Sequence, residues 1–278
     1  MRRGAGGESA VNDWRVETGD AMRLIPTLED GSVSLVFTSP PYPGQKGNTQ
    51  SAGKWLIWLG VAVRLLCPRL APAAVLALNV TMKRTAAGWF DTRLWQGVTH
   101  VIETAGLNCL DTYIWHKTNG AQNGPLTYAD APGYELVFVY TKAERPGDVT
   151  FNAQRAPYAA KSISANGAAR IGYGRTKEPN GDGARQTNVI SLPTHASDGQ
   201  RPRAQGVSFP RELPARFIRQ YTNPGDLVLD PFAGVGTTGR MAVELGRRFI
   251  GFELDAAEAE QARQWIADAP ARLLPVTE

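Results

Sequence analysis

A glycine-rich turn restricts the fold of this 278-residue chain more than any other feature. An apolar strand runs into Asp230–Gly239, which contains the pattern Gly-x-Gly-x-x-Gly and is followed by an apolar helical pattern. The next strand, Phe249–Phe252, ends at Glu253. A strand, a glycine turn, a helix and a strand ending in an acid are typical of a nucleotide-binding βαβ unit.

The residues around this turn indicate which ligand it would take. The N–H groups that open the helix favour an anionic group, and Glu253 is placed to accept from both hydroxyls of a ribose. The pattern also matches the fingerprint of NAD-binding proteins. However, Asp230 at the strand tip would repel a pyrophosphate, whereas it suits a cofactor with a cationic amino-acid end, such as S-adenosylmethionine. From this motif alone, an NAD site and a purely structural turn both stay open.

The rest of the chain alternates apolar strands with helical patterns. This alternation predicts an α/β fold, a doubly wound and mostly parallel sheet with helices on both faces. The predicted strands besides those of the βαβ unit are Trp14–Thr18, Val33–Phe37, Ala74–Val80, Leu110–Trp115 and Leu136–Thr141.

Residues 143–206 differ from the rest in composition. They hold eight glycines and nine lysines and arginines against five acids, while the rest of the chain carries 21 charges of each sign. The whole net charge of +4 therefore lies in this loop-rich segment. Such a distribution permits a nucleic-acid partner.

Cysteine, histidine and apolar patterning exclude other classes of protein. The two cysteines, Cys67 and Cys109, rule out a disulfide scaffold, and with three histidines there is no metal-ligand spacing. No stretch reaches the roughly 20 apolar residues of a membrane span, and the N-terminus has no apolar signal region. We therefore expect a reduced, soluble, intracellular protein without a metal.

A second unusual turn ends the strand Val33–Phe37. It reads Thr38-Ser-Pro-Pro-Tyr, and its prolines have fixed φ angles and no N–H. The stiff backbone therefore presents the Pro40 carbonyl beside the Ser39 hydroxyl and the Tyr42 ring. Two acceptors and an aromatic face suit the exocyclic amine of a flat base, since the acceptors hold its hydrogens while the ring stacks. A rigid loop after a strand is the alternative interpretation.

Together, the two turns resemble those of the amino-methylating DNA methyltransferases of prokaryotes. The order, with the Ser-Pro-Pro-Tyr turn first and the glycine turn near the C-terminus, is similar to the β group of that family. The resemblance covers residues 14–265. It implies a Rossmann-like methyltransferase core made of a catalytic half, 14–142, and a cofactor-binding half, 207–268, with 143–206 as an inserted target-recognition region.

The resemblance also implies roles for single residues, with S-adenosylmethionine as the cofactor. Ser39, Pro40, Pro41 and Tyr42 would be catalytic. The stretch that begins at Tyr134-Glu135 resembles a segment near the flipped base, with tyrosine in place of the family's histidine. The residues implied to bind the cofactor are Asp20, Ala21, Phe209, Pro210, Asp230, Phe232, Gly234, Gly236, Thr237 and Glu253.

Transfer of a methyl group from a sulfonium to an amine needs one in-line displacement, so we expect neither a metal nor a covalent enzyme intermediate. The target base must leave the duplex. The predicted DNA contacts are Arg170, Arg175, Lys177 and Arg185 of the basic segment.

Together these features predict a sequence-specific DNA methyltransferase acting on cytosine N4, because the serine form of the turn resembles cytosine-N4 enzymes. Adenine-N6 methylation is the first alternative, an NAD-dependent oxidoreductase is one of another class, and a catalytically silent DNA-binding homologue is a third. The expected partner is double-stranded DNA in a prokaryotic cytoplasm, at the nucleoid and without membrane contact. A homodimer and a cognate restriction endonuclease acting on the same site are both compatible with the sequence.

Overall fold

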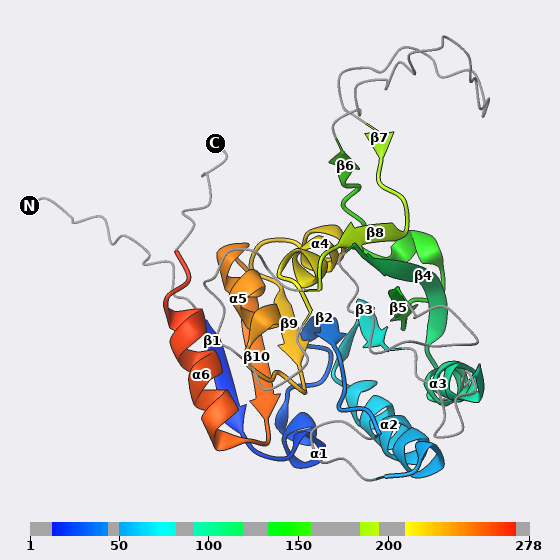
Figure 1. Cartoon of the computed structure of the whole chain (residues 1–278), viewed down its shortest axis with the longest axis horizontal. Coiled ribbons are helices and arrows are strands. Elements are labelled where there is room, and N and C mark those ends of the chain that lie inside the picture. The colour runs from blue at the N-terminus through cyan, green and yellow to red at the C-terminus, as the bar shows by residue number, and fades with distance from the viewer. Residues whose placement is uncertain are drawn as a thin grey trace, which may run out of the picture.

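The structure, a computed structural model, describes residues 13–43, 50–81, 92–118, 133–156, 184–194 and 209–270. Its centre is an eight-stranded sheet, and a two-stranded sheet lies beside it (Figure 1). The strands of the main sheet are β1 (Trp14–Thr18), β2 (Val33–Thr38), β3 (Leu70–Val80), β4 (Asn108–Lys117), β5 (Tyr134–Thr141), β8 (Val189–Leu192), β9 (Leu227–Asp230) and β10 (Arg248–Glu253). The small sheet pairs β6 (Arg155–Ala156) with β7 (Ala184–Arg185).

The main sheet has the strand order β1-β10-β9-β2-β3-β5-β4-β8. Neighbours from β1 to β3 are parallel, as are β4 and β8, whereas β5 is antiparallel to both β3 and β4. The predicted doubly wound, mostly parallel α/β fold is therefore confirmed. The orientation of β5 was not predictable, because a strand buried on both faces is an apolar run in either direction.

Helices cover both faces of the sheet (Figure 1). On one face lie α1 (Ala21–Leu24), its 3₁₀ extension η1 (Ile25–Thr27), α2 (Ala52–Leu66) and α3 (Thr92–Thr104), and on the other lie α4 (Glu212–Tyr221), α5 (Thr237–Glu244) and α6 (Ala256–Ala267). A further 3₁₀ turn, η2 (Pro146–Asp148), follows β5. Each group of helices packs on its own apolar core, which includes Trp55 and Leu59 on the first face and Phe217 and Ile266 on the second.

Because β1, β10, β9, β2 and β3 are parallel, their carboxyl ends meet at one edge, called the carboxyl edge below. The register places Thr18 beside Glu253 and Gly251 beside Asp230. β2 lies on the other side of β9, where Val36 pairs with Leu229. The two turns singled out in the sequence therefore follow neighbouring strands.

Among the elements that the sequence did not predict, α3 and β8 pack directly on the main sheet or extend it. α3 buries Leu94, Val98 and Ile102 at helical spacing. β8 lies inside the basic segment 143–206 yet forms the edge of the main sheet beside β4. The division of the chain at 143 and 206 stays a prediction, and β8 shows that the segment contributes to the core sheet. No helix in the described ranges is long and apolar enough to cross a membrane.

Candidate active site

The Ser-Pro-Pro-Tyr turn leaves β2 at the carboxyl edge and is tied to its neighbours by hydrogen bonds. The Tyr42 hydroxyl donates to the carbonyl oxygen of Asn79, on adjacent β3, and lies 3.0 Å from the Ser39 hydroxyl. From α2, the Trp55 indole N–H donates to the carbonyl of Pro41 at 2.7 Å. Ser39 is half-buried, and the turn that holds it is therefore fixed from two sides.

The surroundings of Tyr42 bear on the role predicted for it. Its side chain is only 2% exposed and packs against Trp55, with ring centroids 5.8 Å apart. Burial, together with the charge of Glu135, raises the pKa of the Tyr42 phenol far above its usual value. Tyr42 therefore stays a neutral hydrogen-bond donor that anchors the turn. The catalytic roles of Ser39, Pro40, Pro41 and Tyr42 stay predictions.

Asp230 links the two turns directly. One of its oxygens accepts from the Thr38 hydroxyl at 2.6 Å and from the Phe232 N–H at 3.1 Å, while the other accepts from the Thr238 hydroxyl at 2.8 Å. The side chain is 2% exposed, and burial raises the pKa of this carboxyl to about 6 against the opposing effect of these hydrogen bonds. The sequence assigned Asp230 to the cationic end of a cofactor. In the structure its carboxylate links β2, β9 and α5 by these hydrogen bonds, and its role toward a cofactor stays a prediction.

The tips of β1 and β10, which carry Asp20 and Glu253, lie side by side, because Thr18 pairs with Glu253. Glu253 accepts from the N–H of Gly234 at 2.8 Å and from that of Asp255 at 3.0 Å, and its own carbonyl accepts from Gly19 at 2.8 Å. Asp20 is exposed and caps α1 by accepting from the Met22 N–H at 2.9 Å. The structure therefore brings together the glycine turn and the two acids that the sequence assigned to one ligand.

The remaining residues predicted to bind the cofactor lie in the glycine turn or in the elements next to it. Gly234 has a φ of +53°, and a Cβ there would meet nothing nearer than the Glu258 carboxylate at 3.9 Å, so open space lies over the turn. Phe232 is half-buried, and Phe209 packs edge-on against Phe37. Gly236 opens α5, and Ala21, Pro210 and Thr237 are buried.

A row of polar side chains, of which Asn79 and Glu135 are buried and Lys117 is half-buried, lies beside the Ser-Pro-Pro-Tyr turn, at the ends of β3, β5 and β4. Lys117 donates to Glu135 at 2.7 Å, and Glu135 accepts from the Asn79 amide nitrogen at 2.6 Å. The Asn79 amide oxygen is buried and has no hydrogen-bond partner among the described residues. Glu135 was noticed in the sequence but Asn79 was not, although a polar residue inside the apolar run of β3 is a visible signal.

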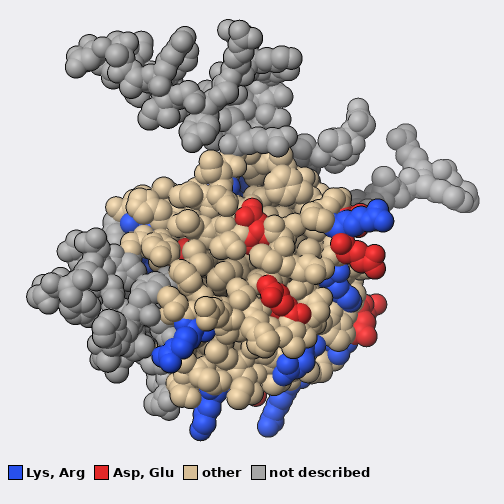
Figure 2. Space-filling view, turned by 90° about the vertical axis from the view of Figure 1, so that its right-hand side faces the viewer, with Lys and Arg blue, Asp and Glu red and all other residues tan. Residues whose placement is uncertain are grey.

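The predicted DNA contacts fall largely outside the described residues. Arg170, Arg175 and Lys177 lie there entirely, and of Arg185 only the backbone, in β7, is described. Figure 2 shows the side of the molecule on which α3 and β4 lie, where the coloured charged residues are scattered and mostly peripheral. The described residues form no continuous basic patch on this face.

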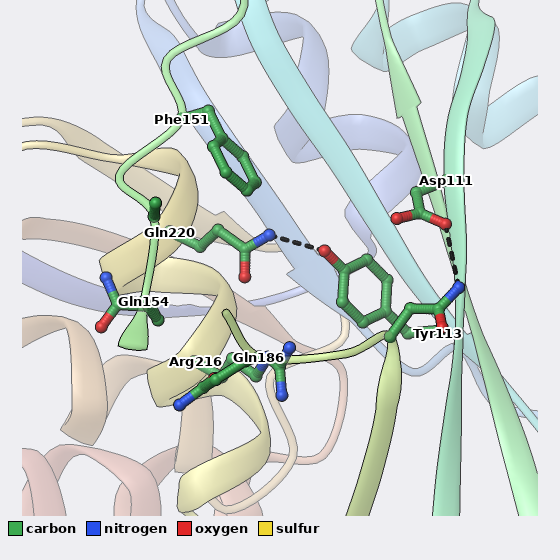
Figure 3. A pocket seen from close by; sticks show the side chains of 9 residues that line it. Asp111, Tyr113, Phe151, Gln154, Gln186, Arg216 and Gln220 are labelled. Atoms are coloured by element: carbon green, nitrogen blue, oxygen red, sulfur yellow. Dashed lines mark hydrogen bonds between the residues drawn. The ribbon is translucent and has the colours of Figure 1, made fainter. Parts of the chain in front are cut away.

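A cavity of about 290 Å³ lies between β4 and α4, at the point where residues 154 and 186 approach the main sheet (Figure 3). Gln220 donates to the Tyr113 hydroxyl at 2.5 Å, and Arg216 lies over the Tyr113 ring. Asp111, at the cavity, is six residues before the end of β4, which places it roughly 20 Å from the carboxyl edge at 3.3 Å per residue. None of the predicted site residues lines this cavity.

The comparisons with known proteins agree with the geometry of the carboxyl edge. A family model described as DNA methylase, N6_N4_Mtase, matches residues 33–264. The chain belongs to this family. This DNA methylase is thus a DNA methyltransferase of the N4/N6 class, and the Ser-Pro-Pro-Tyr turn and the glycine turn both fall inside the matched range.

Individual relatives of this DNA methylase are distant. The Type II methyltransferase M.PvuII of Proteus hauseri is 25% identical, over 85% of this chain and 78% of the relative. M.MjaI, a Type II methyltransferase of Methanocaldococcus jannaschii, is 28% identical, over 88% of both chains.

Solved structures show the same fold. The PvuII DNA methyltransferase, described as cytosine-N4-specific, superposes with a TM-score of 0.71 at 18% identity, over 93% of this chain and 87% of that one. A DNA modification methylase of Thermus thermophilus, solved in complex with S-adenosyl-L-methionine, has a TM-score of 0.64 at 24% identity, over 92% of this chain and 95% of that one.

Proposed function

We propose that this DNA methylase transfers a methyl group from S-adenosylmethionine to the exocyclic N4 of cytosine in double-stranded DNA, after flipping the base. The observation that carries the proposal is the place of Ser39. Its half-buried hydroxyl stands on a proline-stiffened turn at the carboxyl edge, one strand away from the glycine turn. A base amine and a cofactor methyl would meet between these two turns.

The residues present fit the cofactor. A carboxylate offers about four acceptor positions, and Glu253 uses two of them for backbone N–H groups, which leaves two for the hydroxyls of a ribose. Asp20 follows Gly19, whose N–H donates to the Glu253 carbonyl, and its exposed carboxylate suits an adenine amine. Glu253→Ala should therefore weaken S-adenosylmethionine binding in calorimetry by about 1.5–3 kcal/mol, the value of hydrogen bonds to charged groups.

The protein's share of the chemistry is positioning and polarisation. When bound, S-adenosylmethionine supplies an electrophilic methyl group on a sulfonium sulfur. Glu253 and Asp20 would hold this cofactor, and the amine of the base would accept the methyl group with its lone pair and release one proton. Because the amine is conjugated into the base, acceptors for its hydrogens must free the lone pair first. Ser39 and the Pro40 carbonyl supply such acceptors at fixed positions.

Serine at position 39 favours cytosine over adenine. Adenine-N6 enzymes more often carry aspartate or asparagine at this place of the motif, and a relative of the same fold, the PvuII enzyme, is described as cytosine-N4-specific. A hydroxyl is also a smaller and weaker acceptor than a carboxylate. Adenine N6 is the competing product in the same family.

The basic segment is the proposed reader of the DNA sequence. We assign phosphate and base-edge contacts to Arg170, Arg175, Lys177 and Arg185, because the net charge of the chain lies in 143–206. The names of the curated relatives as Type II methyltransferases support a cognate endonuclease acting on the same site.

Digestion of methylated DNA to nucleosides tests this function. Unmodified DNA is incubated with the protein and S-adenosylmethionine, and the nucleosides are separated and weighed by mass spectrometry. The proposal expects N4-methyldeoxycytidine. N6-methyldeoxyadenosine as the only methylated nucleoside would show that the substrate base is adenine and not cytosine, and the assignment as a methyltransferase would stand. NADH-dependent turnover without methyl transfer would overturn both the choice of base and the assignment as a methyltransferase.

A further inference from the structure

We propose that Tyr42 is a positioning residue, whose hydroxyl fixes the Ser39 hydroxyl as a hydrogen-bond acceptor that faces the target amine. The proposal rests on the proposed function, in which Ser39 meets an exocyclic amine, but it does not depend on which base carries that amine. It assigns the Tyr42 hydroxyl a task that is distinct from the stacking predicted for the Tyr42 ring.

The Tyr42 phenol has a single proton to donate. Its hydroxyl bonds to the carbonyl oxygen of Asn79, and a carbonyl has no hydrogen to give. The phenol must therefore be the donor in that bond. It keeps its proton because its burial among apolar side chains disfavours the charged form.

The hydroxyls of Ser39 and Tyr42 are in contact at 3.0 Å. By geometry alone either hydroxyl could donate. Because the proton of Tyr42 is already directed at Asn79, only Ser39 can donate in this contact. The proton of Ser39 then points toward Tyr42, and its lone pairs point away from it.

The consequence for catalysis is electrostatic. A serine with a free rotor would present its proton to an incoming amine part of the time, and a proton there would repel the N–H groups and compete for the nitrogen lone pair. A serine whose proton is held by Tyr42 presents only acceptor positions. The orientation exists before the base arrives, so no reorganisation is needed during the reaction.

The surroundings keep Tyr42 in place. Asn79 belongs to the regular ladder between β3 and β5, where it pairs with Val137, so the accepting carbonyl is rigid. The Tyr42 ring packs on Trp55, which also holds Pro41 by its indole N–H. The hydroxyl of Tyr42 thus links Ser39 to the rigid backbone of β3 through two hydrogen bonds.

Tyr42→Phe tests the proposal because it keeps the ring and removes the hydroxyl. We expect kcat for transfer of a radiolabelled methyl group to plasmid DNA to fall about tenfold or more, with the Kd values for S-adenosylmethionine and for DNA unchanged. Tyr113→Phe is the matched control. It removes a hydroxyl that is also buried and bonded, to Gln220, but lies near the cavity of Figure 3, and it should leave kcat unchanged.

A double-mutant cycle separates an orienting role from a general structural one. If Tyr42 acts through Ser39, Tyr42→Phe should cost nothing further in a Ser39→Ala background. Full kcat in Tyr42→Phe, or equal losses in both backgrounds, would overturn the proposal. The assay counts radiolabelled methyl groups on any base of the DNA. If the product is N6-methyladenine, the assignment to cytosine is refuted, but the comparison of the Tyr42 and Ser39 variants still tests this proposal.

Discussion

Asp230 shows how one residue serves both halves of the site. Its partners Thr38 and Thr238 are 192 and 8 residues away in the sequence, and the acid is buried between them. The sequence predicted that an acid matters at this position, but not that its oxygens would be occupied by the chain itself. Such a contact depends on β2 lying next to β9, which a local pattern does not determine.

The buried carboxyl of Asp230 makes a specific contribution to pH dependence. Burial raises its pKa to about 6 in the folded protein, against about 3.9 when unfolded, so the folded state binds the proton more tightly. The contribution of Asp230 to the free energy of unfolding is therefore largest at low pH, where the carboxyl is protonated, and it is lost as the pH rises through 6. Relative to Asp230→Asn, the wild type should lose roughly 2 kcal/mol of unfolding free energy between pH 4.5 and 7.5.

Urea denaturation of both proteins at the two pH values measures this difference, because the other titrating groups cancel between them. The raised pKa of Asp230 would be contradicted if the difference in unfolding free energy between the wild type and Asp230→Asn stayed constant, or if it shifted in favour of the wild type as the pH rises.

At the scale of elements, the start of α5 depends on two properties of Gly236. Its φ is +84°, and a Cβ would lie 2.9 Å from that of Ala262 on α6. Gly225 is a matched control, since its φ is +85° and a Cβ there would meet nothing within 4 Å. Gly225→Ala should cost about 1–2 kcal/mol of stability from backbone strain. Gly236→Ala should cost about 1–3 kcal/mol more, because it also forces α5 and α6 apart.

Thermal and urea unfolding of the two alanine variants provide the comparison. Equal losses would mean that α6 moves aside without cost and that Gly236 is needed only for its backbone conformation.

Much of the element order was predictable from the sequence. The apolar runs of β2 and β9 and the turns after them predicted both the strand tips and the site residues that follow. The antiparallel course of β5 was not predictable, because burial on both faces removes any directional pattern. β8 was missed because its four residues alternate in burial inside a polar, glycine-rich segment. The hydrogen bond from the Tyr42 hydroxyl to Asn79 was not predictable either, because Asn79 lies on the neighbouring strand β3.

At the scale of the molecule, binding of DNA should depend on the charge of the basic segment. Phosphate contacts release counterions, so log K should fall steeply with log salt. Replacing Arg170, Arg175, Lys177 and Arg185 by glutamine should flatten that slope and leave the affinity for S-adenosylmethionine unchanged. Arg64→Gln and Arg219→Gln, at exposed positions on α2 and α4, serve as controls that should leave the slope nearly as it is. An unchanged slope in the fourfold variant would place the DNA on another face.

The most direct test of the account is the modification pattern in living cells. Genomic DNA from a bacterial host that expresses the protein is sequenced for modified bases, beside DNA from a host expressing Ser39→Ala. We predict N4-methylcytosine within one short sequence motif in the first host, and the loss of this modification with Ser39→Ala. N6-methyladenine instead, or methylation that persists in Ser39→Ala, would contradict the central claim that the Ser39 hydroxyl prepares a cytosine amine for methylation.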